Sequence, residues 1–342
     1  MNLTTRYLGL TLAHPFMPGS SPLAADPDLA LKLEDAGAAA VVMPSLFAEQ
    51  ITPARGSAAA VFPSPSDYAF DTDRYLETIR RTKKRIGVPL IASLNGASAD
   101  SWLTRARLIE QAGADALEAN VYYPATDLAE SAAAVEHRVT DIVAVLMESI
   151  GIPLAVKLSP FYSSLPNLAW RLTNLGAAGL VLFNRFLQQD FDVEPPHDTE
   201  PMRLSDSSEL LLRLHWLRVL SGRLPGSLAV SGGVHTPVDA VKAVLAGADA
   251  VQLVSSLVQH GPLHLAHIRR EFEAWGDAHG YASLADMRGA LSLAQSAEPS
   301  DVARGDYIHV LQAGRRAHVP WGIAPREPGG AGATHTPKSR RG

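Results

Sequence analysis

The chain has 342 residues, 46% of them hydrophobic and 19% charged, with a formal net charge of −5, a composition typical of a globular enzyme with a large buried core. The charge gives no reason to expect a nucleic-acid or membrane partner, no apolar run approaches the roughly 18 residues that span a bilayer, and the N-terminus lacks a signal-peptide pattern, so a cytoplasmic protein is expected. The absence of cysteine excludes disulfides, cysteine-bound metal centres and a thiol base, and no metal site is predicted.

A short pattern recurs four times, in which a glycine and one or more alanines lead into an apolar run. Its copies are 37–42, 113–118, 176–181 and 247–252. In each copy the glycine follows a helix-like segment, where a left-handed helix cap is favoured, and the apolar run is typical of a buried strand. A second connector, at 86–90 and 150–154, also leads into strands.

In chain order these patterns predict eight strands separated by helices. The expected strands are 15–18, 40–44, 89–94, 115–121, 153–158, 179–184, 227–231 and 250–254. The expected helices are 26–36, 99–112, 128–149, 166–175, 206–221, 236–246 and 263–279. Alternating strands and helices indicate right-handed βαβ units in a parallel sheet, and eight units favour an α/β fold of the (β/α)8 TIM barrel type. The alternative is a doubly wound open sheet, although no Gly-x-Gly-x-x-Gly follows any strand.

Two stretches, 47–75 and 185–205, read as loops that follow a strand. Both should therefore lie at the C-terminal face, where barrel enzymes keep their chemistry. They fit either solvated insertions or a lid or wall of the site. Residues 1–325 are expected to form the barrel, and 326–342, rich in Gly, Pro, Thr and Arg, a disordered tail.

The loops after the last two predicted strands have the composition of a phosphate site. Ser231-Gly232-Gly233 leads into a helix start at Thr236-Pro237, and Val254-Ser255-Ser256 follows the eighth strand. Glycine lets backbone N–H groups approach an anion closely, and barrel phosphate sites commonly form from the loops after strands 7 and 8. The alternative is that these glycines only make tight turns.

Further polar side chains end other predicted strands. Lys157 is the only lysine at a strand end; it can stabilise charge on a flavin ring, form a Schiff base, or pair with Glu118. Asn120 and Asn184 can donate and accept in plane, which suits a flat heterocycle. The tyrosines at 122–123 fit packing, a π-face or a phenolic acid or base.

In these residues the sequence resembles dihydroorotate dehydrogenase, across roughly residues 3–275. The matching stretches are 15–21, 89–94, 113–120, 156–160, 231–234 and 247–252. The resemblance implies FMN at the barrel mouth, with Ser20, Asn120 and Lys157 beside the isoalloxazine and Lys157 near its N1/O2 edge. It assigns the FMN phosphate to Gly232, Gly233, Val254 and Ser255. Because the chain begins almost directly at the barrel, it is similar to the soluble, class 1 branch.

The implied reaction is oxidation of dihydroorotate to orotate in pyrimidine biosynthesis. The family pairs hydride transfer to flavin with proton removal by a Cys or Ser, and Tyr123 occupies that base position here. A tyrosine with an ordinary pKa of about 10 is a poor base at neutral pH. Catalytic roles are thus implied for Tyr123 and Lys157.

The substrate side of the implied site departs further from the family. Ser45 and Asn184 remain as substrate-binding candidates, whereas Ala125 replaces a substrate-contacting Asn and Pro44 replaces the Lys usually found before Ser45. A site that loses polar partners loses discrimination for its substrate.

Three functions therefore stay open. The first is an FMN-dependent oxidoreductase of dihydroorotate dehydrogenase type, acting on a CH–CH group. The second is a flavoprotein of the same fold with another substrate or a redox-partner role, and the third is a non-redox phosphate-binding barrel with a Schiff base on Lys157. A small-molecule substrate is expected; a homodimer, a redox partner subunit and the electron acceptor (fumarate, NAD through a partner, or a quinone) are open.

Overall fold

A computed structural model gives the fold. It describes residues 1–47, 49, 71–96, 102–186, 190–194, 196–199, 203–294, 296 and 298–316. The chain divides into two compact units, Met1–Ala294 and Gln295–Gly342. The second unit contains helix α12 (Pro299–Arg316). The predicted tail, and the boundary predicted at residue 325, lie outside the described residues.

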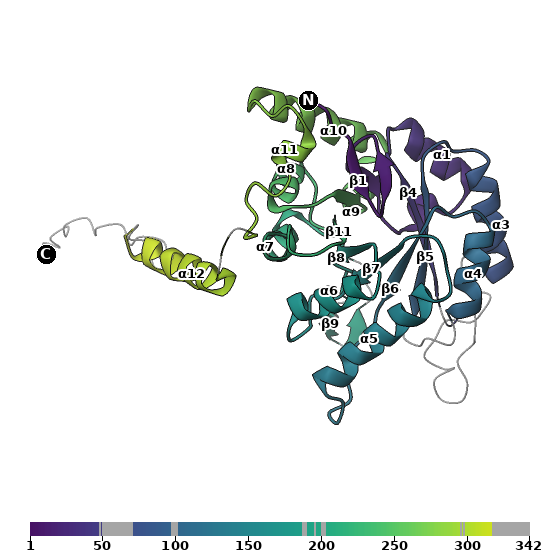
Figure 1. Ribbon diagram of the computed structural model, residues 1–342, viewed down its shortest axis with the longest axis horizontal. Coiled ribbons are helices and arrows are strands. Elements are labelled where there is room, and N and C mark those ends of the chain that lie inside the picture. Colours follow the sequence, from purple (N-terminus) through teal and green to yellow (C-terminus); the bar gives the residue numbers. More distant parts are fainter. Residues whose placement is uncertain are drawn as a thin grey trace, which may run out of the picture. The chain divides into compact units, whose positions relative to one another are not determined.

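A sheet of eight parallel strands forms the centre of the first unit (Figure 1). The strands are β3 (Phe16–Pro18), β4 (Val41–Phe47), β5 (Leu90–Gly96), β6 (Ala116–Val121), β7 (Leu154–Leu158), β8 (Gly179–Leu182), β11 (Ser227–Ser231) and β12 (Ala250–Leu253). They pair in the order β3-β12-β11-β8-β7-β6-β5-β4. The Ala39 amide, just before β4, donates to the Phe16 carbonyl in β3 at 3.0 Å and so joins the two ends of the sheet. The predicted TIM barrel is confirmed.

Helices surround the strands in the first unit (Figure 1). They are α1 (Pro27–Asp35), α3 (Thr72–Lys83), α4 (Leu103–Gln111), α5 (Ala132–Met147), α6 (Leu165–Asn174), α7 (Leu210–Leu220), α8 (Pro237–Ala246), α9 (Ser255–His260), α10 (Leu263–Ala278) and α11 (Leu284–Met287), with 3-10 turns at Pro22–Ala24 and Ser207–Glu209. In α8, Thr236 and Asp239 form a capping box, and Gly247 ends the helix at φ +120°. These are the start and stop signals that the sequence pattern predicts. Among the described residues, no helix is both long enough and apolar enough to cross a membrane.

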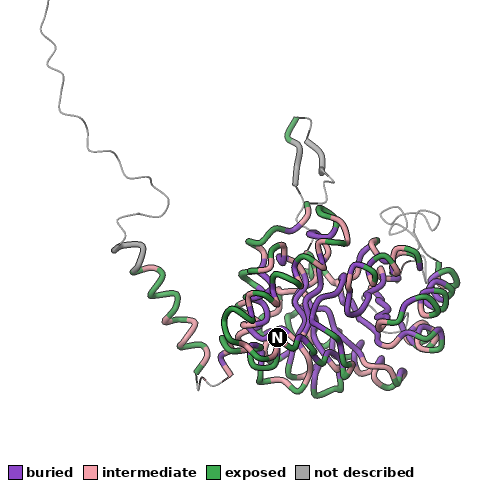
Figure 2. Tube along the Cα trace, turned by 90° about the horizontal axis from the view of Figure 1, so that it is seen from above, coloured by how far each residue is buried: buried purple, intermediate pink, exposed green. Residues whose placement is uncertain are grey.

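Burial is concentrated on the strands, as Figure 2 shows in purple. All six residues of β6 and all five of β7 are buried. The repeated Gly-Ala pattern also supplies a polar contact, because in two copies an aspartate follows the alanine. Asp115 accepts the Leu90 N–H at 2.7 Å and Asp249 accepts the Leu228 N–H at 2.8 Å. Each carboxylate thereby satisfies an amide near the start of the neighbouring strand.

A hairpin closes the amino end of the barrel. It comprises β1 (Thr5–Tyr7) and β2 (Leu10–Leu12). Tyr7, Leu8 and Leu12 pack with small residues at the strand starts, and a Cβ on Gly179 would lie 2.7 Å from the Leu8 side chain. The Leu8 amide donates to Ser227 Oγ at 3.2 Å. The hairpin therefore fills the interior of the barrel at its amino end.

The structure corrects both predicted loops. In the stretch 47–75, most of which lies outside the described residues, α3 begins at Thr72. Its charged sequence obscures the apolar face made by Tyr75, Leu76 and Ile79. In the stretch 185–205, β9 (Asp190–Val193) and β10 (Pro196–Thr199) form an antiparallel hairpin, whose strands of four residues each are too short to stand out in sequence.

Candidate functional site

The loop after β11 is held in a conformation that only glycine tolerates. Gly232 and Gly233 have φ of +87° and +80°. A Cβ on Gly233 would lie 2.4 Å from the Leu210 backbone nitrogen. On the other side of the turn, the buried Arg213 donates from Nε to the Ser231 carbonyl at 2.5 Å, and burial lowers the pKa of its guanidinium. Because neither glycine has a side chain, the backbone of this loop can approach a bound anion closely.

Ser205 joins the two loops that the sequence assigns to phosphate. Its amide donates to Ser255 Oγ at 3.0 Å, and its own Oγ accepts the Gly233 N–H at 3.4 Å. The same hydroxyl lies 3.2 Å from His235 Nε2. Val254 precedes α9 and hence adjoins Ser255. The structure thus brings Gly233 and Ser255 together, and adds Ser205 and His235, which sequence reasoning missed.

A buried polar network crosses the barrel near its mouth. Lys157 Nζ lies 3.4 Å from Glu118 Oε1, and Gln252 Nε2 donates to Glu118 Oε2 at 2.6 Å. Glu118 is 0% and Lys157 5% exposed. A buried carboxylate needs such partners, because an unpaired charge in an apolar interior is very costly.

Two amide oxygens in the same region have unmet hydrogen-bonding capacity. Asn120 pairs in register with Lys157 across β6 and β7. Within the described part of the chain, Asn120 Oδ1 and Gln252 Oε1 are buried and have no hydrogen-bond partner. The Gln252 amide orientation is fixed by Glu118, which requires a donor. Buried acceptors without partners are uncommon and call for a ligand or water.

A chain of hydroxyl groups lines the neighbouring strands. Ser20 Oγ lies 3.2 Å from Ser45 Oγ, which lies 2.8 Å from Ser93 Oγ. The Ser93 amide donates to the Tyr75 hydroxyl at 2.9 Å. The structure therefore connects Ser20, a predicted cofactor residue, with Ser45, a predicted substrate residue. Pro44 contributes only its carbonyl, which accepts from Tyr75 at 3.0 Å.

Tyr123 belongs to a separate charged cluster after β6. Its hydroxyl donates to Glu130 Oε2 at 2.8 Å, and Arg138 Nη2 donates to Glu130 Oε1 at 2.6 Å. The Arg138 guanidinium also lies 3.8 Å from the centroid of the Tyr123 ring. The hydrogen bond to Tyr123 is the main cause that raises the pKa of Arg138. Sequence reasoning missed Glu130 and Arg138.

Asn184 follows β8 beside an aromatic group. The Asn184 backbone N–H donates to the Leu158 carbonyl at 2.8 Å. This bond holds Asn184 beside the end of β7. Phe186 lies 5.9 Å from Tyr122 and 4.7 Å from Phe161 between ring centroids. Three consecutive strand-to-helix loops thus supply an aromatic wall at the mouth.

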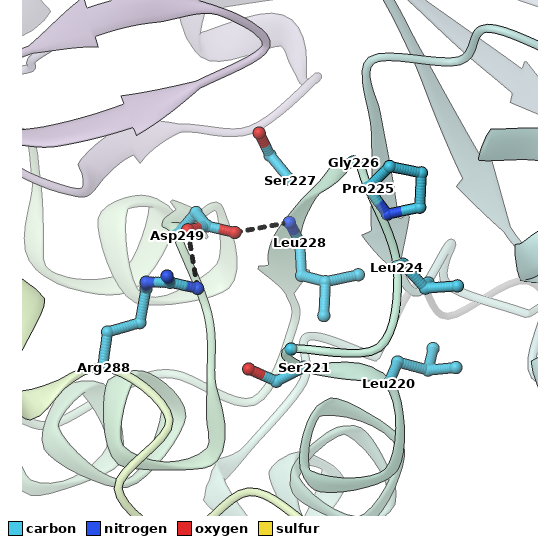
Figure 3. Close-up of a pocket in the computed structure, with 10 residues that line it drawn as sticks. Leu220, Ser221, Leu224, Pro225, Gly226, Ser227, Leu228, Asp249 and Arg288 are labelled. Carbon is cyan, nitrogen blue, oxygen red and sulfur yellow. Dashed lines mark hydrogen bonds and ion pairs between the residues drawn. The ribbon is translucent and has the colours of Figure 1, made fainter. Parts of the chain in front are cut away.

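A pocket lies at the opposite end of the barrel (Figure 3). Its volume is about 240 Å³, and its lining includes Ser227, Asp249 and Arg288. Asp249 pairs with Arg288 at 3.2 Å, and burial raises the pKa of its carboxyl. Ser227 and Asp249 stand at strand starts, the end of a barrel that serves stability rather than catalysis, and Arg288 reaches them from the end of α11. No group of three or more His, Cys, Asp or Glu side chains in the described residues is arranged to hold a metal ion.

Comparisons with known proteins identify the family of the chain. A family model described as dihydroorotate dehydrogenase matches residues 71–275. The catalytic subunit of dihydroorotate dehydrogenase B (NAD(+)) from Thermoplasma acidophilum is 26% identical over 298 residues, covering 84% of this chain and 98% of the relative. Dihydroorotate dehydrogenase A (fumarate) from Lactiplantibacillus plantarum is 28% identical over 306 residues, covering 82% and 96%. The putative dihydroorotate dehydrogenase A (fumarate) from Aeropyrum pernix is 27% identical over 219 residues, covering 62% and 70%.

Proposed function

Because the chain belongs to the dihydroorotate dehydrogenase family, we propose that it is an FMN-dependent oxidoreductase that oxidises dihydroorotate to orotate. One observation carries the proposal: a buried ion pair and two unmatched amide oxygens lie near the mouth of a barrel whose loop after β11 turns on two glycines with positive φ. Relatives that cover most of this chain are named dihydroorotate dehydrogenases, which are oxidoreductases.

The residues present fit FMN. An isoalloxazine carries an N–H donor between two carbonyl oxygens, and the unmatched Oδ1 of Asn120 is an acceptor suited to it. Lys157, fixed by Glu118, supplies positive charge for the ring edge that gains negative charge on reduction. Gly232, Gly233, Val254 and Ser255 would hold the phosphate through amides and a hydroxyl, and Ser20 would contact the ring.

Chain residues also account for handling the substrate. Bound FMN supplies the hydride acceptor. Ser45 and Asn184 would orient the substrate through hydrogen bonds, and Tyr123 would accept the proton from the substrate carbon. The aromatic wall at Tyr122, Phe161 and Phe186 would exclude water from the reacting face. A homodimer and a redox partner subunit stay predictions.

The test is anaerobic mixing of the FMN-loaded protein with dihydroorotate. Loss of flavin absorbance near 450 nm at an ordinary enzymatic rate is expected. A protein that holds FMN but is not bleached by dihydroorotate would favour another substrate, since Pro44 and Ala125 replace polar residues of the family. A protein that takes up no FMN would contradict the proposal altogether.

A further inference from the structure

We propose that Glu130 is the final proton acceptor in this oxidation, acting through the Tyr123 hydroxyl, and that Arg138 is the positioning residue for both. The inference rests on the proposed function and assigns roles to two residues outside the strand ends. It begins from a chemical difficulty. A phenol is a weak base at neutral pH, so Tyr123 alone does not remove a proton from carbon efficiently.

The geometry supplies the missing acceptor. Tyr123 stands two residues after β6 ends, and its hydroxyl already donates to the Glu130 carboxylate at 2.8 Å. The Glu130 side chain is only 10% exposed, so water competes little for this hydrogen bond. A hydroxyl that is hydrogen-bonded to a carboxylate does not have to lose its proton beforehand, because both proton transfers occur along one line of contacts.

The relay balances. As the Tyr123 oxygen takes the proton from the substrate carbon, its own proton passes to Glu130 Oε2. The neighbouring substrate carbon gives its hydride to the FMN of the proposed function, and a carbon–carbon double bond forms. Tyr123 ends as a neutral phenol and Glu130 as a carboxylic acid, which later returns its proton to water. The substrate is oxidised by two electrons and FMN is reduced by two.

Arg138 holds the pair in place from two directions. Its Nη2 donates to Glu130 Oε1 at 2.6 Å, which keeps the second carboxylate oxygen occupied and leaves Oε2 for Tyr123. Its guanidinium lies 3.8 Å from the centroid of the Tyr123 ring, within the range of a cation–π contact. A planar, permanently charged group makes both contacts at once, which a lysine would not.

Substitution of Glu130, which lies just before α5, tests the relay, and a buried, ion-paired glutamate within α5 is the matched control. Glu136 stands in α5, pairs with Arg171 at 3.4 Å and is 13% exposed. Glu130→Gln is expected to slow flavin reduction by dihydroorotate by roughly 10²- to 10⁴-fold, the usual contribution of a general base. Glu136→Gln should leave the rate within about twofold of wild type. FMN affinity should be unchanged in both variants.

Isotope effects separate a proton relay from a structural clamp. In Glu130→Gln, deuterium on the substrate carbon that loses the proton should slow the reaction more than in wild type, because proton transfer becomes rate-limiting. Glu130→Asp should restore part of the rate. Tyr123→Phe combined with Glu130→Gln should be no slower than Tyr123→Phe alone, because the two residues act as a unit.

The outcomes are distinguishable. If dihydroorotate bleaches the wild-type flavin and Glu130→Gln reacts as fast as Glu136→Gln, the relay is wrong and the proposed function stands. If Glu130→Gln slows reduction without changing the isotope effect, Glu130 is only structural and the relay is again overturned. If wild type holds FMN but dihydroorotate does not reduce it, the proposed function fails and the relay fails with it.

Discussion

The two ends of the barrel differ in how their buried polar groups find hydrogen-bond partners. At the amino end, the charged groups and several backbone amides have partners: Asp249 accepts the Leu228 N–H and pairs with Arg288, and Leu8 donates to Ser227, although the Tyr7 hydroxyl has no partner in the described residues. At the carboxyl end, Asn120 Oδ1 and Gln252 Oε1 are buried without a partner in the described residues. The backbone of a parallel sheet presents polar groups at both ends of the barrel. The unmatched acceptors at the carboxyl end therefore reflect a role in ligand binding rather than a general property of strand ends.

The comparison teaches where to look for function. An end whose charges pair, as Asp249 and Arg288 do, and whose interior is filled by a hairpin contributes stability. An end that keeps a paired cation, a glycine turn and unmatched amide acceptors has retained capacity for a ligand. Substitutions at the mouth should therefore change FMN binding, whereas substitutions at the amino end should change only the free energy of unfolding.

The largest effect is expected at Lys157. Lys157→Met leaves the Glu118 carboxylate buried without its cation, which should lower the free energy of unfolding by about 3–5 kcal/mol. Adding Glu118→Gln should recover much of that loss, since no charge then remains buried, but should not restore flavin reduction. Urea denaturation of the single and double variants measures this; a double variant as unstable as Lys157→Met would contradict the account of the ion pair.

Gly233 should show the next largest effect. Gly233→Ala combines a positive φ, which costs about 1–2 kcal/mol for alanine, with a clash against the Leu210 backbone. FMN affinity should fall at least about tenfold, equivalent to roughly 1.4 kcal/mol, as measured by flavin fluorescence. The control is Gly261→Ala, where φ is +79° and nothing lies within 4 Å. Equal FMN affinities in the two variants would remove Gly233 from the phosphate site.

At the amino end, His14 should make the fold acid-sensitive. Burial lowers its pKa to about 4 from 6.5, with a further contribution from Arg269, and its Nδ1 accepts the Phe16 N–H. Above pH 6.5 His14 contributes nothing; as the pH falls toward 4, the unfolded chain takes up a proton that the folded chain refuses. Stability should fall by about 2 kcal/mol between pH 8 and pH 5 from this group.

His14→Asn should flatten this part of the pH profile, because its amide oxygen can still accept the Phe16 N–H. The control is His137→Asn at an exposed position. Urea midpoints measured across the range give the profile. A His14→Asn profile that parallels wild type would mean that His14 is not the group responsible.

The smallest effect is expected at Tyr7. Its hydroxyl is buried with no hydrogen-bond partner among the described residues, and burial, followed by the Glu118 charge, raises its pKa. Tyr7→Phe should therefore leave the free energy of unfolding within about 1 kcal/mol of wild type. FMN affinity should not change. A loss of several kcal/mol in thermal or urea unfolding would show that the hydroxyl has a partner after all.

The fold could be predicted from sequence because its signals are local. Buried strands and capping glycines such as Gly247 are predicted by patterns only a few residues long. Helix α3 escaped because its polar residues outnumber its apolar face. The hairpin β1–β2 escaped because three-residue strands carry too little pattern.

Only part of the candidate site could be predicted from the sequence, because only some of its residues carry a local signal. Gly232, Gly233 and Ser255 stand directly after strands, where their composition is informative. Glu130 and Arg138 contact Tyr123 only after the loop folds onto α5. No spacing of residues in the sequence therefore predicts these contacts. Gln252 did carry a signal, as a polar residue inside an apolar strand, comparable to Glu118.

The central claim is that the barrel mouth holds FMN, by its phosphate at the Gly233 loop and by its ring beside Asn120 and Lys157. Titration of the apoprotein with FMN and with riboflavin, followed by quenching of flavin fluorescence, tests it most directly. Tight saturable binding of FMN, weaker binding of riboflavin, and loss of FMN binding in Gly233→Ala are predicted. Equal affinity for the two flavins, or no binding of either, would contradict the account.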